Sequence, residues 1–212
     1  MKIIESIIGY PRSGNHWLCY CISCISNCKI GQESYAHGNT IQYWNKFNDQ
    51  NNFVFIFRNY KESIVRHLRE NISIDNIIEQ LSGISAKEIN KDKTDYIALL
   101  KMYDEYPPDK KFLIFYEDLI KNPEKELKRF LEFTGEDLSR ADEFIKKIDY
   151  HKRQSLMYYK NNVQSPITNG NKNNLIFHSL KLNKQDRICI DNYLKEKFPI
   201  LFEKYLTRYS EN

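Results

Sequence analysis

The chain has 212 residues, of which 41% are hydrophobic and 14% aromatic, and it carries a formal net charge of +4. This composition excludes a disordered chain, and the length predicts a single domain over residues 1–212 with a sizeable core. The charge is too small for a general nucleic-acid binder, so an anion site would have to be local. No apolar run approaches the roughly 20 residues that span a membrane, and no leader-like segment precedes the first strand. We therefore expect a cytoplasmic protein with neither nucleic acid nor membrane as a partner.

Strands and helices alternate along the chain. Continuous apolar runs predict buried strands over residues 3–9, 53–57 and within 110–119. Helical patterns predict helices over residues 15–27, 61–71, 74–81, 94–106, 122–135 and 142–148, with closing helices in 182–209. Residues 31–49 and 150–177 are polar and are predicted as loops. This alternation predicts an α/β fold with a P-loop-like central parallel β-sheet flanked by α-helices on both sides.

Polar residues gather at the ends of the first two predicted strands. They lie at Gly9–Asn15 after the first strand and at Arg58–Asn59 after the second. Ligands bind α/β sheets beyond the carboxyl ends of parallel strands. We therefore expect these two segments to meet at one edge of the sheet.

Gly9 and Gly14 frame a G-x-x-x-x-G turn that leads from the first strand into a helix. Backbone N–H groups at such a helix N-terminus bind a tetrahedral anion, although the pattern also occurs in ordinary strand–turn–helix units. Arg12 adds a permanent, forked donor inside the turn. An ATP- or GTP-binding loop would carry Lys and then Ser or Thr where this chain has Asn15 and His16. This difference argues against a magnesium-dependent nucleotide hydrolase.

Three segments resemble motifs of the sulfotransferases that depend on PAPS, 3′-phosphoadenosine 5′-phosphosulfate. YPRSGNHWL resembles the family's phosphosulfate loop YPKSGTTW, and FVFIFRNYKESIVRHL resembles its 3′-phosphate segment, a strand ending in RNPKD. LIFYEDLIKNPEKELKRFLEFTG resembles its stretch from YEDL through NP to FLG. The three segments occur in the family's order within residues 6–135. The resemblance implies in-line transfer of a sulfuryl group from PAPS to a hydroxyl on a small molecule, lipid or glycan, with release of PAP and without a metal.

The same resemblance implies which residues hold the 5′ end and the adenine of PAPS. The anion loop would consist of Arg12, Ser13, Gly14, Asn15 and His16. Arg12 takes the place of the family's loop lysine, which contacts the phosphosulfate and its bridging oxygen. Trp17 and Tyr116 match aromatic residues near the adenine, although Trp17 on its own also reads as a core aromatic. Glu117 and Asp118, which follow Tyr116, are expected to be structural.

Arg58 matches the family's arginine that binds the 3′-phosphate. The family's second ligand, a serine eight residues later, is replaced here by Arg66. Ser63 lies three residues before Arg66 and can share a helix face with it, so both are candidates. Gly170 takes the place of a glycine in a C-terminal segment that returns to the 3′-phosphate, although the basic residues before it in the family are absent here.

Transfer to a hydroxyl requires a general base, and five histidines are available. In hydroxyl-acting members of the family the base is a histidine about twenty residues before the 3′-phosphate arginine. His37 lies 21 residues before Arg58 and is therefore the predicted base, although a solvated loop histidine is the alternative. His16, which borders the anion loop, is the second candidate. His67 lies on a charged helix and is expected to be solvated.

Two other interpretations stay open. Cys21, Cys24 and Cys28 share a helix and could suggest zinc, but small buried thiols are the expected reading, so no metal site is predicted. The altered 3′-phosphate residues also fit a non-catalytic PAP- or nucleotide-binding module on the same fold. A P-loop nucleotide kinase is disfavoured by the missing Lys-Ser/Thr pair.

Overall fold

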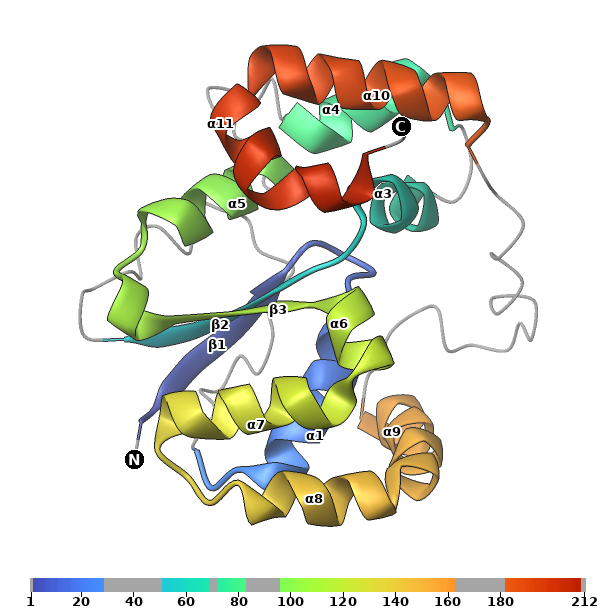
Figure 1. The fold of residues 1–212 in the computed structure, drawn as a ribbon. Helices are drawn as coiled ribbons and strands as arrows, with labels where there is room; N and C mark the ends of the chain where they lie inside the picture. The colour runs from blue at the N-terminus through green and yellow to red at the C-terminus, as the bar shows by residue number, and fades with distance from the viewer. Residues whose placement is uncertain (1, 29–50, 69–71, 83–95, 163–181, 211–212) are drawn as a thin grey trace.

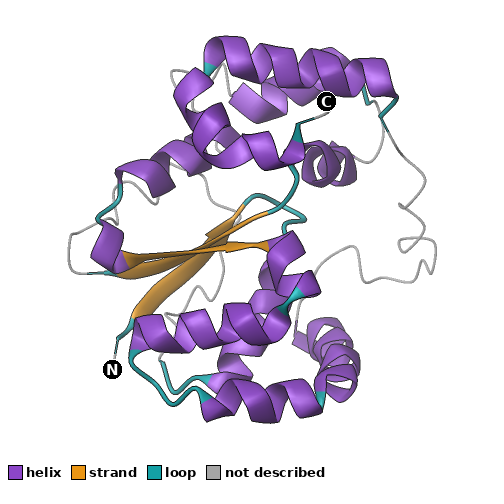
Figure 2. Ribbon diagram, viewed as in Figure 1, coloured by secondary structure: helices purple, strands orange, loops and turns teal. Residues whose placement is uncertain are grey.

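The structure is a computed structural model, described over residues 2–28, 51–68, 72–82, 96–162 and 182–210. Its centre is a parallel sheet of three strands in the order β1 (Ile4–Gly9), β2 (Asn52–Phe57) and β3 (Lys111–Phe115). The register pairs Ile8 with Phe55 and Phe55 with Leu113. All three predicted strands are present, and helices cover both faces of the sheet (Figure 1 and Figure 2).

The described helices form two layers (Figure 1). Those above the sheet in Figure 1 are α3 (Tyr60–Leu68), α4 (Ile74–Ser82), α5 (Tyr96–Glu105), α10 (Lys184–Lys197) and α11 (Pro199–Leu201). Those below are α1 (Asn15–Ile25), α6 (Tyr116–Lys121), α7 (Pro123–Thr134), α8 (Ser139–Lys146) and α9 (Ile148–Asn162). A 3₁₀ turn, Pro108–Lys110, precedes β3, and short helical turns continue from α11 to Tyr209. This arrangement confirms the predicted α/β class with helices on both sides.

The central strand β2 builds two separate cores because its side chains alternate between the faces of the sheet. Phe53, Phe55 and Phe57 pack into the core beneath α3, α4, α5 and α10. Val54 and Ile56 pack into the core against α1, α7 and α8. Every residue of β2 is buried, as expected for a parallel strand covered on both faces.

Two segments have a different secondary structure from the one predicted. The third strand ends at Phe115, and the YEDL segment that follows is already helix α6. Residues 150–162, predicted as loop, belong to α9. Here His151 hydrogen bonds to the hydroxyl of Tyr20 on α1 at 3.1 Å and stacks on Phe144 of α8 at a centroid distance of 4.1 Å. These tertiary contacts outweigh the polar composition of the segment.

None of the helices in the described part of the chain combines the length and the apolar character of a membrane span. The predicted loop at residues 31–49 and the end of the second predicted loop, residues 163–177, lie outside the described residues.

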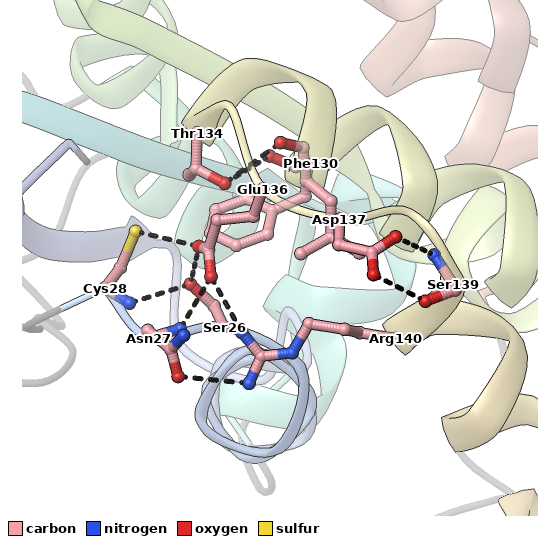
Figure 3. Close-up of polar contacts among 10 residues, drawn as sticks. Ser26, Asn27, Cys28, Phe130, Thr134, Glu136, Asp137, Ser139 and Arg140 are labelled. Carbon is pink, nitrogen blue, oxygen red and sulfur yellow. Dashed lines mark hydrogen bonds and ion pairs between the residues drawn. The ribbon is translucent and has the colours of Figure 1, made fainter.

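Glu136, in the turn between α7 and α8, binds the residues that follow α1 (Figure 3). Its carboxylate accepts hydrogen bonds from the Ser26 hydroxyl, the Asn27 N–H at 2.8 Å and the Cys28 thiol at 3.3 Å, and it pairs with Arg140 at 2.9 Å. Burial raises the pKa of Glu136, but the hydrogen bonds from Asn27, Ser26 and Cys28 lower it further than burial raises it. The pKa of Glu136 therefore lies below the usual value, and the ionised carboxylate stabilises the fold.

We expect Glu136→Gln to lower the free energy of unfolding at pH 7 by about 1–2 kcal/mol, because the bonds to a charged acceptor are weakened. A lowered pKa in the folded state gives stability that is present above the usual glutamate pKa of about 4.3 and is lost as the pH falls through the folded value. The difference in the free energy of unfolding between the wild type and the variant should therefore shrink as the pH falls from about 5 to about 3. Urea denaturation at several pH values measures it.

Glu124→Gln is the matched control, because Glu124 pairs with Lys128 on the exposed surface of α7. Its effect on stability should be much smaller. A Glu136→Gln variant as stable as the wild type at pH 7 would contradict the assigned role.

Candidate active site

The turn between β1 and α1 has the backbone of an anion-binding loop. The Ser13 N–H donates to the Tyr10 carbonyl at 3.1 Å and closes the turn. Arg12 and Gly14 have positive φ angles of 69° and 92°, and the Gly14 carbonyl accepts from the Leu18 N–H at 3.1 Å as α1 begins. Left-handed residues before a helix N-terminus direct N–H groups toward a common anion. A positive φ at arginine is strained by about 1–3 kcal/mol, and such strain clusters at functional sites.

Both glycines of the turn are required because other groups approach them closely. A Cβ on Gly9 would lie 2.5 Å from Asn15 Oδ1 and 2.7 Å from the carbonyl oxygen of Ile56. A Cβ on Gly14 would lie 2.6 Å from Cε2 of Tyr116 and closer still to Cδ2. The Asn15 amide donates to the Gly9 carbonyl at 3.3 Å and so ties the start of α1 to the end of β1.

Arg58 joins the carboxyl ends of β1 and β2. It follows β2 directly, and its Nη1 donates to the carbonyl of Arg12 at 3.5 Å. Its Nη2 pairs with Glu62 at 2.7 Å, and its guanidinium carbon lies 4.4 Å from the ring centroid of Tyr116. The β1–α1 turn and the start of α3 thus meet at one end of the sheet, as predicted, and α6 joins them there (Figure 1).

Two buried atoms that can donate a hydrogen bond lie at this edge and have no hydrogen-bond partner within the described residues. They are the Ser13 hydroxyl oxygen and Arg58 Nε. Ser13 is 0% exposed and the Arg58 side chain only 12% exposed. Buried polar groups are nearly always paired, since an unmade hydrogen bond costs about 1–3 kcal/mol. Both groups can donate, so the residues present fit a ligand that carries phosphate or sulfate oxygens.

The two candidates for a second 3′-phosphate ligand differ in their surroundings. Ser63 is fully buried, and its hydroxyl donates to the carbonyls of Asn59, just before α3, at 3.1 Å and of Tyr60 at 3.3 Å. Arg66 is half-buried; burial lowers its pKa, and the nearby Arg58 guanidinium lowers it further. The Ser63 hydroxyl is therefore engaged by its own helix, whereas the Arg66 side chain lies near Arg58.

His16 and Trp17 lie in the first turn of α1, and both are half-buried. The Trp17 ring packs against Tyr20 at a centroid distance of 6.0 Å and against Phe144 of α8 at 6.1 Å. Tyr20 in turn contacts His151 of α9. Trp17 therefore belongs to an aromatic cluster between α1, α8 and α9, and it has a packing role beside the anion loop.

His37 and Gly170, both predicted site residues, lie outside the described residues. Among the described histidines, the prediction for His67 was wrong. His67 is half-buried, and its ring meets that of Tyr10 edge-on at a centroid distance of 5.6 Å. The reason is that Tyr10 turns from the end of β1 into the core beneath α3.

Sequence reasoning missed the link between the site and the C-terminal end of the chain. Glu117 accepts hydrogen bonds from the Asn59 N–H at 2.9 Å and from the Tyr209 hydroxyl at 2.7 Å. Asp118 accepts two hydrogen bonds from Arg208, at 3.0 and 2.6 Å. These contacts hold the start of α3 against α6. No local pattern in the sequence signals them, because the partners lie far apart along the chain.

The cysteines of α1, which were expected to be buried, differ in exposure. Cys21 is buried, and burial raises the pKa of its thiol, whereas Cys24 is exposed. Across the described parts of the chain, no group of three or more His, Cys, Asp or Glu side chains is placed to hold a metal ion.

Two protein-family models match this chain, and both describe sulfotransferases. A model described as "Sulfotransferase family" matches residues 37–140, and a model described as "Sulfotransferase domain" matches residues 93–198, half of the chain. Among curated proteins, none matches the chain significantly. The crystal structure of mouse sulfotransferase SULT7A1 complexed with PAP is similar, with a TM-score of 0.62 and 17% identity over 97% of this chain and 89% of that one. A sulfotransferase from Alicyclobacillus acidocaldarius gives a TM-score of 0.44 and 13% identity over 85% and 67%.

Proposed function

The chain belongs to the sulfotransferase family, and from this premise we propose that it transfers the sulfuryl group of PAPS to a hydroxyl acceptor by in-line displacement and releases PAP. The observation that supports this most directly is the convergence of the anion loop and Arg58. There, within the described residues, Ser13 Oγ and Arg58 Nε are buried donors without a partner. The similar mouse enzyme was solved with PAP, which makes PAP the first ligand to test.

We assign the β1–α1 turn to the 5′ end of the donor. Bound PAPS supplies an electrophilic sulfuryl group on a good leaving group. The N–H groups of the turn and the Ser13 hydroxyl would bind the anionic oxygens. Arg12 would stabilise negative charge on the bridging oxygen, because preorganised donors at a developing charge contribute strongly to catalysis. Arg58 and Arg66 would bind the 3′-phosphate through charge-assisted hydrogen bonds.

The proton of the acceptor hydroxyl requires a base, and we propose His37 for this role. His16 at the start of α1 is the alternative. We expect His37→Ala to reduce turnover by roughly 100-fold, the lower range for loss of a general base. PAP affinity should be nearly unchanged, because the residue faces the acceptor in this proposal. Unchanged turnover would remove His37 from the mechanism, and His16→Ala then tests the alternative.

Calorimetry with PAP tests the proposed function. We expect binding in the micromolar range without added metal, followed by mass-spectrometric detection of a sulfated product when PAPS and a panel of hydroxyl acceptors are supplied. No PAP binding at millimolar concentrations would contradict the proposal. PAP binding without transfer to any acceptor would instead favour the non-catalytic binding module. Magnesium-dependent ATP binding would favour a nucleotide kinase.

The second 3′-phosphate ligand can be identified with a matched pair of variants. We expect Arg66→Ala to weaken PAP binding about tenfold, the loss of one charge-assisted hydrogen bond. Ser63→Ala should leave PAP affinity unchanged, because its hydroxyl bonds to carbonyls of its own helix. Titration of both variants by calorimetry measures the difference, and the opposite ranking would return the role to Ser63.

A further inference from the structure

The peptide group that links Arg58 to Asn59 is bound on both sides by side chains from other helices. The hydroxyl of Tyr96, the first residue of α5, donates to the Arg58 carbonyl at 2.7 Å. The N–H of the same peptide group donates to Glu117 Oε1 at 2.9 Å, and the other carboxylate oxygen of Glu117 accepts from the Tyr209 hydroxyl at 2.7 Å. Both polar groups of the main chain are therefore bound at the point where β2 has ended.

The Tyr96 side chain is held firmly by its surroundings. It is fully buried, and its ring packs against the rings of Tyr10, Phe57 and Tyr60 at centroid distances of 5.5, 5.6 and 6.1 Å. Burial raises the pKa of Tyr96 well above its usual value, so the hydroxyl stays protonated and remains a donor. A binding group must be held to within about 0.5 Å, and packed side chains that hydrogen bond to its support provide this precision.

The other end of α5 makes the same kind of contact with the other end of β2. Tyr106 directly follows α5, and its hydroxyl donates to the carbonyl of Asn51 at 2.7 Å, just before β2 begins. Tyr106 is buried as well. Two tyrosine hydroxyls thus bind the two ends of one strand, and only the Tyr96 end leads into Arg58. The chain therefore contains its own control for the effect of such a hydroxyl on the stability of the fold.

We propose that Tyr96 is a positioning residue, which fixes the main chain of Arg58 and thereby the place of its guanidinium, without itself contacting the ligand. This inference rests on the proposed function and concerns a residue of α5, outside the donor site. A residue that acts through Arg58 affects ligands that carry the 3′-phosphate more than ligands that lack it. A hydroxyl with a purely structural role would instead lower stability and change the affinity for both ligands alike.

The experiment compares PAP with adenosine 5′-phosphate, which lacks the 3′-phosphate, by calorimetry. We expect Tyr96→Phe to weaken PAP binding about fivefold, an effect of the size of one hydrogen bond, and adenosine 5′-phosphate binding less than twofold. Tyr106→Phe is the matched control, which should lower the urea midpoint similarly but change PAP affinity less than twofold. In a chain that already carries Arg58→Ala, Tyr96→Phe should cause no further loss of PAP affinity, which tests the same role with PAP alone.

Equal losses of PAP affinity in Tyr96→Phe and Tyr106→Phe would overturn the proposal, because both hydroxyls would then act through stability. Equal losses for the two ligands in Tyr96→Phe would also overturn it, as would a further loss in the Arg58→Ala background. Unchanged PAP affinity in Tyr96→Phe would remove the positioning role and leave the proposed function intact. Failure of the wild type to bind PAP at millimolar concentrations would overturn the proposed function itself, and this role with it.

Discussion

Replacing Gly14 with alanine is expected to weaken PAP binding about 1000-fold. The new methyl group would lie within 2.6 Å of the Tyr116 ring, and the residue would keep a φ of 92° that alanine disfavours. The loop can then persist only if Tyr116 moves, which also breaks the contact of its ring with the Arg58 guanidinium carbon, 4.4 Å from the ring centroid. Loss of two charge-assisted hydrogen bonds, at about 2 kcal/mol each, gives a factor of this size. Calorimetry with PAP measures it.

Gly135 offers a matched control for the backbone. It ends α7 with a φ of 73°, and a Cβ there would meet nothing within 4 Å. Gly135→Ala should therefore lose about 1 kcal/mol of stability from its backbone angle and leave PAP binding intact. Similar PAP affinities for the two variants would show that the contact between Gly14 and Tyr116 is not needed for the site.

The first strand, its turn and the central strand could be predicted because their signals are local. A run of five apolar residues, Phe53 to Phe57, is too short for a typical helix and rich in aromatic and β-branched residues, which favours a buried parallel strand, and β2 occupies Asn52–Phe57. Gly9 and Gly14 mark the turn because neither position tolerates a Cβ. The meeting of this turn with Arg58 follows from parallel strand direction alone.

The remaining parts of the fold and the site depend on contacts between segments that are far apart in the sequence. The periodicity of hydrophobic residues does not indicate such contacts. Residues 150–162 are polar, yet the segment is helical, and His151 contacts Tyr20 of α1 and Phe144 of α8. The placement of Tyr116 against Gly14 and Arg58 depends on how α6 leaves β3. The contact between Glu117 and Tyr209 has no local signature either.

A second large effect is expected at Lys61, in the first turn of α3. Its Nζ donates to both carboxylate oxygens of Asp191 on α10, at 2.9 and 3.0 Å, and to the Tyr209 carbonyl at 2.6 Å. The Tyr60 hydroxyl donates to the same carboxylate. The side chains of the ion pair are only 5% and 2% exposed. The pair therefore joins α3 to α10 and to the C-terminal end within the core.

We expect Lys61→Met to lower the free energy of unfolding by about 3–5 kcal/mol, because Asp191 stays buried without a cation to balance it. Urea denaturation measures the loss. Lys128→Met is the control, since Lys128 also pairs with two carboxylates, Glu124 and Asp142, but on the surface of α7. Its effect should be far smaller, because water screens an exposed pair. Equal losses in the two variants would contradict the importance of burial.

The double variant Lys61→Met/Asp191→Leu separates the cost of a lone buried charge from the value of the pair. It should regain most of the lost stability, because replacing a buried ion pair with apolar groups is often neutral or stabilising. The double variant also remains informative if Lys61→Met does not fold.

Lys61 lies in the first turn of α3, close in sequence to Arg58, so PAP affinity is the second measurement on the double variant. Recovered stability with weaker PAP binding would show that the ion pair orients the start of α3 for the ligand, whereas recovery of both would assign the pair to stability alone.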